Sequence, residues 1–149
     1  MAKKDLSHID LKKFHHATPI QIRFVDIDKL GHVNNATILS YFETARVAYL
    51  NEVIGRENDW VGNGLILAHS EIDYLRPVYQ DDKIVAHTRT TRIGQKSFAV
   101  ENVLMCLENG KELTCAYATG VLVCMNYREK ITAELPEEWK KKLSAFGKL

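Results

Sequence analysis

The sequence predicts an α+β domain in which an antiparallel sheet of about five strands wraps around one long central helix. Three observations support this prediction: one alternating segment near the start of the chain, a single long stretch with helical spacing, and a later series of four strand-like runs separated by turn residues. Strands that follow one another without intervening helices favour an antiparallel sheet over alternating βαβ units.

The length of 149 residues fits one domain, because a chain of roughly this size buries about 68–70% of its unfolded surface on folding. We expect a single domain over residues 1–149, with a core at about 15–125 and a short C-terminal helix at 136–146. The chain is 46% hydrophobic and 26% charged with a net charge of +1. It lacks the basic excess of a nucleic-acid-binding protein, so no nucleic-acid partner is expected.

The first strand is predicted at His16–Phe24, where apolar and polar residues alternate. The helix is predicted at Thr37–Val53, because apolar residues recur there at intervals of three and four. The stripe consists of Ile38, Phe42, Ala45, Tyr49 and Val53. Leu39, Ala48 and Leu50 flank it, so we expect sheet to cover the helix on several sides.

After a glycine-rich break at Gly55, Gly62 and Gly64, the chain turns to strand-like patterns. The four predicted strands are Leu65–Leu75, Lys83–Arg92, Ser97–Leu107 and Leu113–Met125. The links at Ile93–Lys96 and Glu108–Glu112 are short enough for antiparallel hairpins. The closing helix follows Pro136 and places two acidic residues in its first turn.

The remaining composition indicates a cytoplasmic protein. The chain has three cysteines, an odd number, at Cys106, Cys115 and Cys124. They lack CxxC spacing and lie in strand-like runs, so we expect buried, reduced thiols. The first fourteen residues contain no apolar stretch typical of a signal peptide, and no window reaches the length of a membrane span.

The segment from Phe24 to Arg46 carries the most chemical information, because polar residues gather there between a strand and a helix. Asp26 and Asp28 follow the strand, and Gly31 permits a tight turn. Either Asn34 or Asn35 is a favoured residue for capping the helix that follows. A carboxylate is therefore expected to face the amino terminus of a helix.

This arrangement suits acyl transfer. Unpaired N–H groups at a helix start can stabilise the negative charge that develops on a thioester carbonyl oxygen. Asp28 could activate water as a general base or attack the carbonyl carbon as a nucleophile, and the sequence leaves both roles open.

At these residues the chain resembles the 4-hydroxybenzoyl-CoA thioesterase-like family of hotdog-fold acyl-CoA thioesterases. The resemblance rests on DxDxxG at Asp26–Gly31 and YxExAR at Tyr41–Arg46. It extends to DYLRPVYQDD at Asp73–Asp82 and RIGQKSF at Arg92–Phe98, and covers roughly His15 to Met125. It implies the hotdog fold and hydrolysis of acyl-CoA thioesters to free acid and CoA.

The resemblance also implies catalytic roles. Asp28, the second acid of the motif, is the expected catalytic carboxylate, and the N–H of Asn35 is expected to point toward the thioester oxygen. Bacterial short-chain acyl-CoA members often have His at the position of Asn35, and this chain departs from them there. It is instead similar to the GHVNN variant shared with plant acyl-ACP thioesterases, in which the His at position 32 is implicated. His32 is therefore a second catalytic candidate.

The same resemblance implies the substrate contacts and the assembly. Gly31 and Asn34 are expected to line the substrate site. Arg92, Lys96 and Ser97 match the region that approaches the pantetheine arm and the nucleotide phosphates, although two cations in a hairpin are also common in an ordinary solvated turn. Two protomers are expected to join their sheets edge to edge, with the site at the dimer interface, and dimers can pair into tetramers.

Other interpretations remain open or are disfavoured by spacing. A hotdog hydratase or dehydratase and a noncatalytic acyl-thioester-binding module are the two rivals. The acidic loop places Leu30 at the fifth position of a calcium loop and Thr37 at the twelfth, where a bidentate Glu is needed, and the six histidines include no HExxH. We expect no metal and no cofactor, since coenzyme A is part of the substrate. His15 and His16 are expected to be solvated at the start of the first strand.

Coenzyme A and acyl carrier protein both remain possible carriers, and the acyl-chain preference is not predicted. The Glu43 and Arg46 side chains lie three residues apart on the predicted helix. We expect an ordinary side-chain pair there, unless the acid reaches the acyl tunnel.

Overall fold

The structure, a computed structural model, describes residue 6, residues 9–55 and residues 62–149. Parts of the predicted glycine-rich break and of the amino-terminal segment lie outside these residues. The elements are a 3₁₀ helix η1 (Leu11–Lys13), β1 (His16–Ile20), a 3₁₀ helix η2 (Phe24–Asp26), α1 (Asn35–Val53), β2 (Asn63–Tyr74), β3 (Ile84–Ile93), β4 (Ser97–Glu108), β5 (Lys111–Asn126), β6 (Ile131–Thr132) and α2 (Glu137–Gly147).

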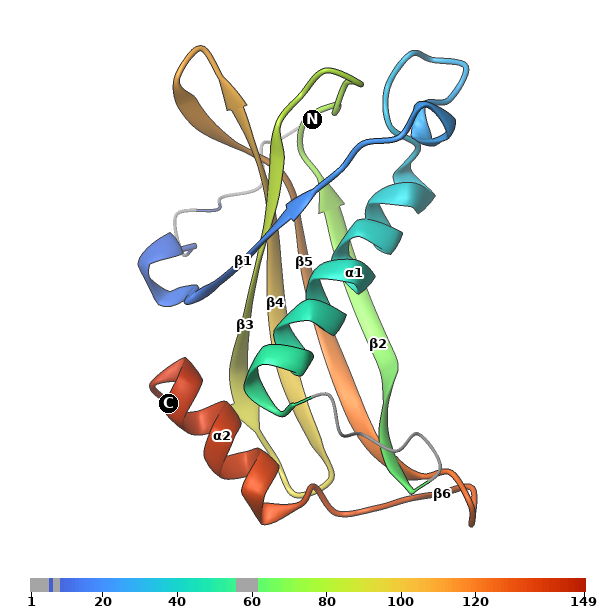
Figure 1. Cartoon of the computed structure of the whole chain (residues 1–149), viewed down its shortest axis with the longest axis vertical. Helices are drawn as coiled ribbons and strands as arrows, with labels where there is room; N and C mark the ends of the chain where they lie inside the picture. Colours follow the sequence, from blue (N-terminus) through green and yellow to red (C-terminus); the bar gives the residue numbers. More distant parts are fainter. Residues whose placement is uncertain (1–5, 7–8, 56–61) are drawn as a thin grey trace.

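The strands form one antiparallel sheet in the order β1-β3-β4-β5-β2, and the two-residue β6 pairs with the end of β5. α1 lies across one face of the curled sheet (Figure 1). Register shifts between Leu67 and His69 and between Thr90 and Arg92 interrupt the ladders, and such bulges increase local twist. The predicted α+β architecture, a sheet curled around one long helix, is confirmed.

The predicted hairpins are also present. β3 and β4 join through Gly94–Lys96, and β4 and β5 join through Asn109 and Gly110. Asn109 and Gly110 have φ values of 50° and 75°. Positive φ at both central residues is the requirement of a type I′ turn, which matches the twist of the flanking strands.

The long helix begins two residues before its predicted start. Asn34 is its N-cap, and the Asn34 side chain accepts a hydrogen bond from the N–H of Ala36. All five residues of the predicted stripe are buried, together with Tyr41 and Leu50. Leu39 and Val47 are 43% and 44% exposed. The expectation that sheet covers the helix on several sides is therefore wrong for this face within one protomer.

The first strand ends earlier than predicted, at Ile20 rather than Phe24. Arg23 and Asp26 bond to each other and turn the chain into η2, so the alternation does not continue in the sheet. Phe24 and Val25 are consequently 82% and 77% exposed.

His16 differs from its predicted solvated position. It is buried, and its Nδ1 lies 2.7 Å from Glu52 Oε2 while its Nε2 lies 2.8 Å from Thr18 Oγ1. These bonds tie β1 to the last turns of α1, which the local sequence pattern does not reveal. His15, in contrast, is exposed.

The core occupies both faces of the sheet. Between α1 and the sheet, one buried cluster surrounds Phe42 and a second surrounds Tyr49. Leu143 of α2 joins the second cluster, so the closing helix seals that end of the core. On the opposite face, Phe14 from the amino-terminal segment packs with Val103 and other side chains of β4 and β5.

The three cysteines are buried and carry no disulfide, which confirms their predicted burial. Among the described residues, no helix has the length and apolar character needed to cross a bilayer.

Candidate active site

A buried carboxylate anchors the loop between η2 and α1. Asp26 is 2% exposed and accepts hydrogen bonds from the Arg23 guanidinium at 2.7 Å and from the Tyr41 hydroxyl at 2.7 Å. The hydrogen bonds from Arg23 and Tyr41 lower the pKa of Asp26 to about 2, although burial opposes this shift. Burial and the carboxylate in turn raise the pKa of Tyr41. Asp26 therefore stays ionised and fixes the loop to α1.

The loop itself closes as a tight turn around Asp28. The N–H of Gly31 donates to the carbonyl of Asp28 at 3.0 Å, and the N–H of Asp28 donates to the carbonyl of His32 at 3.0 Å. Gly31 has φ of 84°, a conformation that favours glycine. The half-buried Asp28 accepts the N–H of Leu30 through Oδ1 at 2.8 Å. Oδ2 of Asp28 has no hydrogen-bond partner in the described part of the chain.

The start of α1 leaves one backbone donor unused. The first N–H groups of a helix have no acceptor within it. Here the Asn34 side chain accepts the N–H of Ala36, and the Asn34 carbonyl accepts those of Thr37 and Ile38. The N–H of Asn35 has no acceptor among residues 9–55 and 62–149. This N–H is available to an external oxygen at the positive end of the helix dipole.

A cavity of about 350 Å³ lies at this end of α1. His32 and Asn35 form one wall, and the segment that follows β2, including Arg76 and Tyr79, forms another. The Tyr74 hydroxyl also lines it and donates to the Asn35 carbonyl at 3.1 Å. Nδ1 of His32 lies 3.3 Å from the Val33 carbonyl oxygen.

The structure thus brings five of the predicted site residues into one loop and helix start. His32 and Asn35 line the cavity directly. Asp28, Gly31 and Asn34 belong to the same hydrogen-bonded turn but do not line this cavity within one protomer. Their catalytic and binding roles stay predictions.

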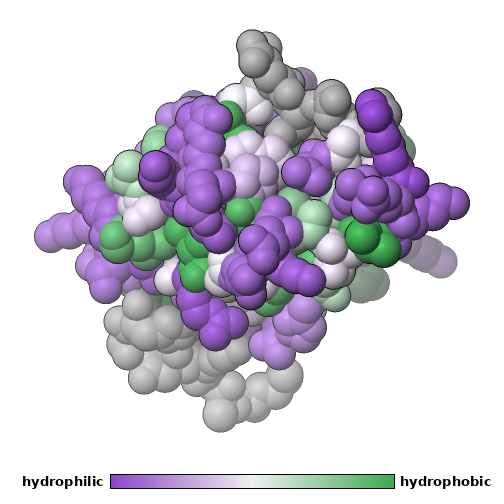
Figure 2. Space-filling view, turned by 90° about the horizontal axis from the view of Figure 1, so that it is seen from below, coloured by the Kyte–Doolittle hydropathy of each residue, from purple (hydrophilic) through white to green (hydrophobic). Residues whose placement is uncertain are grey.

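The other three predicted site residues lie elsewhere. Arg92, Lys96 and Ser97 flank or form the β3–β4 turn, at the end of the sheet opposite the start of α1 (Figure 1). The surface at that end is largely hydrophilic, with small hydrophobic patches (Figure 2). Arg92 and Lys96 are exposed. One protomer therefore does not bring these residues to Asp28, and their contact with substrate remains a prediction.

Sequence reasoning missed two contributors to the site. The sequence pattern assigned Asp26 no role of its own, but it is the buried anchor of the loop, because Tyr41 reaches it from fifteen positions along the chain. Tyr74 holds the carbonyl of Asn35, and the only signal for it was its place in the quoted Asp73–Asp82 segment.

Within the described residues, no three His, Cys, Asp or Glu side chains lie close enough to hold a metal ion together.

Comparisons with known proteins show the family of the chain. Residues 22–143 match the family model of the thioesterase-like superfamily. The chain is 30% identical over 120 residues to a 1,4-dihydroxy-2-naphthoyl-CoA hydrolase of Synechococcus elongatus, covering 78% of this chain and 85% of that one. A match to the uncharacterized protein YsmA of Bacillus subtilis, 29% identical, spans only about half of that relative, 54%.

A solved structure is similar as well. A thioesterase of Thermus thermophilus, complexed with coenzyme A and Zn, is 33% identical with a TM-score of 0.79, covering 93% of this chain and 98% of that one. The family match spans the anchored acidic loop, the free helix N–H and most of the sheet. The chain therefore belongs to the thioesterase-like superfamily and has its hotdog fold.

Proposed function

We propose that this chain hydrolyses acyl-CoA thioesters, with Asp28 as the catalytic carboxylate and the N–H of Asn35 as the oxyanion donor. The observation that carries the proposal is the unused N–H of Asn35 beside the tight turn that holds Asp28. This pair supplies the two groups that thioester hydrolysis requires.

In the proposed reaction, Asp28 takes a proton from water while the water oxygen bonds to the thioester carbonyl carbon. The carbonyl oxygen becomes an oxyanion that accepts the N–H of Asn35. The oxyanion collapses, the carbon–sulfur bond breaks, and the leaving thiolate takes up the proton that Asp28 received from water. Direct attack by Asp28, with an anhydride that water then opens, remains the alternative route. His32 lines the cavity and is proposed to contact the reacting group.

Coenzyme A is the proposed carrier. The Synechococcus relative is named as the hydrolase of a CoA thioester, and the Thermus thioesterase was solved with coenzyme A. Acyl carrier protein is the competing carrier. The proposed chemistry uses no metal and no further cofactor.

We also propose that the active unit is a homodimer joined through β2, which can pair again into a tetramer. β1 and β2 are the two edges of the sheet. β1 has five residues and contains Pro19, which suits an edge strand whose outer side pairs with no further strand. β2 has twelve residues without proline and exposes Ile66 and Leu67. Such an edge favours pairing with a second copy.

This dimer would also bring Arg92, Lys96 and Ser97 of one protomer close to the proposed site of the other. Antiparallel pairing of β2 with its copy reverses the direction of the partner. The partner's β3–β4 turn would then lie at the same end of the joined sheet as the first protomer's α1 start. Gly31 and Asn34 would line the substrate from the first protomer.

The proposal is tested by incubating the purified protein with acyl-CoA esters while free thiol is measured. Thiol release at rates that scale with enzyme concentration is expected. An absorbance change from enoyl-CoA without thiol release would instead indicate a hydratase. Binding of the ester without any turnover would indicate a noncatalytic module.

The buried, unbridged Cys106, Cys115 and Cys124 fit a reducing compartment, and we propose a cytoplasmic location.

A further inference from the structure

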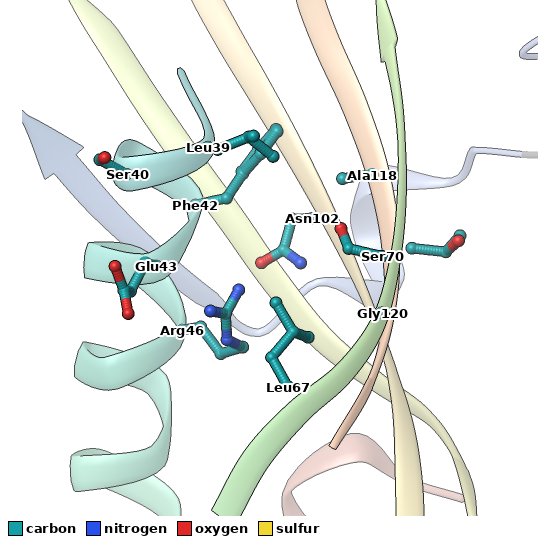
Figure 3. A pocket seen from close by; sticks show the side chains of 11 residues that line it. Leu39, Ser40, Phe42, Glu43, Arg46, Leu67, Ser70, Asn102, Ala118 and Gly120 are labelled. Atoms are coloured by element: carbon teal, nitrogen blue, oxygen red, sulfur yellow. The ribbon is translucent and has the colours of Figure 1, made fainter. Parts of the chain in front are cut away.

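A second cavity, of about 310 Å³, lies between α1 and the strands β2, β4 and β5 (Figure 3). Leu39, Phe42, Leu67 and Ala118 give it apolar walls. Arg46 is a polar exception whose guanidinium points into the space between the helix and the sheet (Figure 3). An apolar cavity with a few polar groups is typical of a site for a small organic ligand.

Arg46 lacks the partner that a half-buried cation usually has. No carboxylate lies within 4.0 Å of its guanidinium in the described part of the chain. Glu43, one turn away, also borders the cavity, but it is exposed and its carboxylate points away from Arg46 (Figure 3). Burial lowers the pKa of Arg46, while the charge of Glu43 opposes this effect. A guanidinium that has lost water without gaining an acceptor is poised to bind one from a ligand.

Asn102 adds a second donor to the same cavity. Its side chain, 2% exposed, extends from β4 toward Arg46 (Figure 3). The Oδ1 atom accepts the Thr88 hydroxyl at 3.0 Å, which leaves the amide Nδ2 as the group available to a ligand. The guanidinium of Arg46 and the side-chain amide of Asn102 together form a pair of hydrogen-bond donors in largely apolar surroundings.

This cavity lies farther along α1 than the cavity at Asn35, with Leu39 on its wall and the neighbouring Ile38 on the wall of the other. Asn35 and Arg46 are separated by about 16 Å of helix axis at the usual rise per residue. Side chains tilt toward the helix amino terminus, so Arg46 reaches back toward Asn35. An acyl group whose carbonyl lies at Asn35 would extend past Leu39 toward Arg46.

We propose that this cavity holds the acyl group of the substrate and that Arg46 and Asn102 select acyl groups carrying an oxygen acceptor remote from the thioester. Plain alkyl chains would leave both donors unpaired and are turned over less well. This inference rests on the proposed thioesterase function.

The test compares three CoA thioesters of equal chain length that end in a methyl, a hydroxyl or a carboxylate group. kcat/KM for thiol release is measured for the wild type, Arg46→Met and Arg46→Lys. Arg128→Met is the matched control, because Arg128 is exposed in the turn after β5. Melting temperatures report whether each variant is folded.

The wild type is expected to favour at least one oxygen-bearing ester over the methyl ester by tenfold or more, roughly 1.4 kcal/mol. Arg46→Met should lose this preference, Arg46→Lys should keep part of it for the carboxylate ester, and Arg128→Met should match the wild type. A preference for the carboxylate alone indicates an ion pair, and one shared by the hydroxyl ester indicates hydrogen bonding.

Equal or faster turnover of the methyl ester by the wild type would overturn the inference, even if Arg46→Met does not fold. A folded Arg46→Met variant that retains the preference would also overturn it. Both outcomes leave the thioesterase proposal intact, whereas release of thiol from none of the esters would defeat that proposal and this inference with it.

Discussion

Two acidic residues separated by one position have different environments in this loop. Asp26 is buried against Arg23 and Tyr41, whereas Asp28 is half-buried and uses only one carboxylate oxygen in hydrogen bonds among the described residues. A carboxylate with three strong donors is stabilised in its ionised form and is a poor proton acceptor. The residue geometry therefore gives Asp26 a structural role, and Asp28 is the carboxylate of the proposed chemistry.

The Asp26 anchor predicts a specific acid sensitivity. Its pKa of about 2 lies below the ordinary value of 3.8. The anchor therefore stabilises the fold fully above pH 4, and this stabilisation is lost as the pH falls toward 2, because the unfolded chain binds the proton first. Arg23 is exposed, so solvent screens its charge and weakens its interaction with Asp26. We therefore expect Asp26→Asn to lower the free energy of unfolding at pH 7 by only about 1–2 kcal/mol.

Urea unfolding of the wild type and of Asp26→Asn at several pH values measures this effect. The difference between the two should shrink as the pH falls from 4 to 2. Asp81→Asn is the control, since Asp81 is exposed. A difference that does not change with pH would show that the Asp26 charge contributes no stability.

For single residues, the sequence predicted part of the site. Asp28 and the Asn34 cap lie in the predicted turn and helix start, because local turn and capping preferences determine them. The burial of Asp26 and His16 was not predictable in the same way. Their partners Tyr41 and Glu52 are distant in sequence, and only the packing of α1 brings them close.

At the scale of elements, the important junction is the one between the acidic loop and α1. Asn34 satisfies three N–H groups of the first helical turn with its side chain and carbonyl, and the N–H of Asn35 is left over. Hydrophobic spacing predicted this helix well, because its buried stripe follows the helical period. It predicted the end of β1 poorly, since the Arg23–Asp26 interaction overrides the alternation there.

Asn35→Pro isolates the proposed oxyanion donor. Proline is favoured at the first helical position and lacks the N–H, and Asn34 already has the extended φ and ψ of −60° and 138° that a residue before proline adopts. We expect kcat for thiol release to fall about 10²–10³-fold relative to Asn35→Ala, which keeps the N–H.

Circular dichroism should show the same helix content in both variants. Equal kcat values for the proline and alanine variants would remove the Asn35 N–H from the mechanism.

At the scale of the whole molecule, the two sheet edges differ in a way that bears on assembly. β2 is long and exposes apolar side chains, whereas β1 is short and contains Pro19. The fold class and strand order follow from patterns along the chain. The positions of Arg92 and Lys96 relative to Asp28 do not follow from these patterns, because in the proposed dimer they depend on how the two protomers pair.

Ile66→Lys tests the proposed β2 interface. Ile66 is 38% exposed on this strand, and a charge on a sheet edge disfavours pairing with another strand. We expect sedimentation equilibrium to show a dimer for the wild type and a monomer for the variant, with thiol release reduced. Ile131→Lys is the matched control on β6, where Ile131 is 54% exposed. An unchanged mass for Ile66→Lys would place the interface elsewhere.

The proposed hydrolysis depends on the Asp28 carboxylate, and Asp28→Asn removes that carboxylate while keeping the shape of the side chain. The amide oxygen can still accept the N–H of Leu30, so the turn and the assembly should be preserved. We predict that thiol release from acyl-CoA falls by about 10²–10⁴-fold while the melting temperature and the mass in solution stay the same. Thiol release at the wild-type rate by the folded variant would exclude Asp28 as the general base and as the nucleophile.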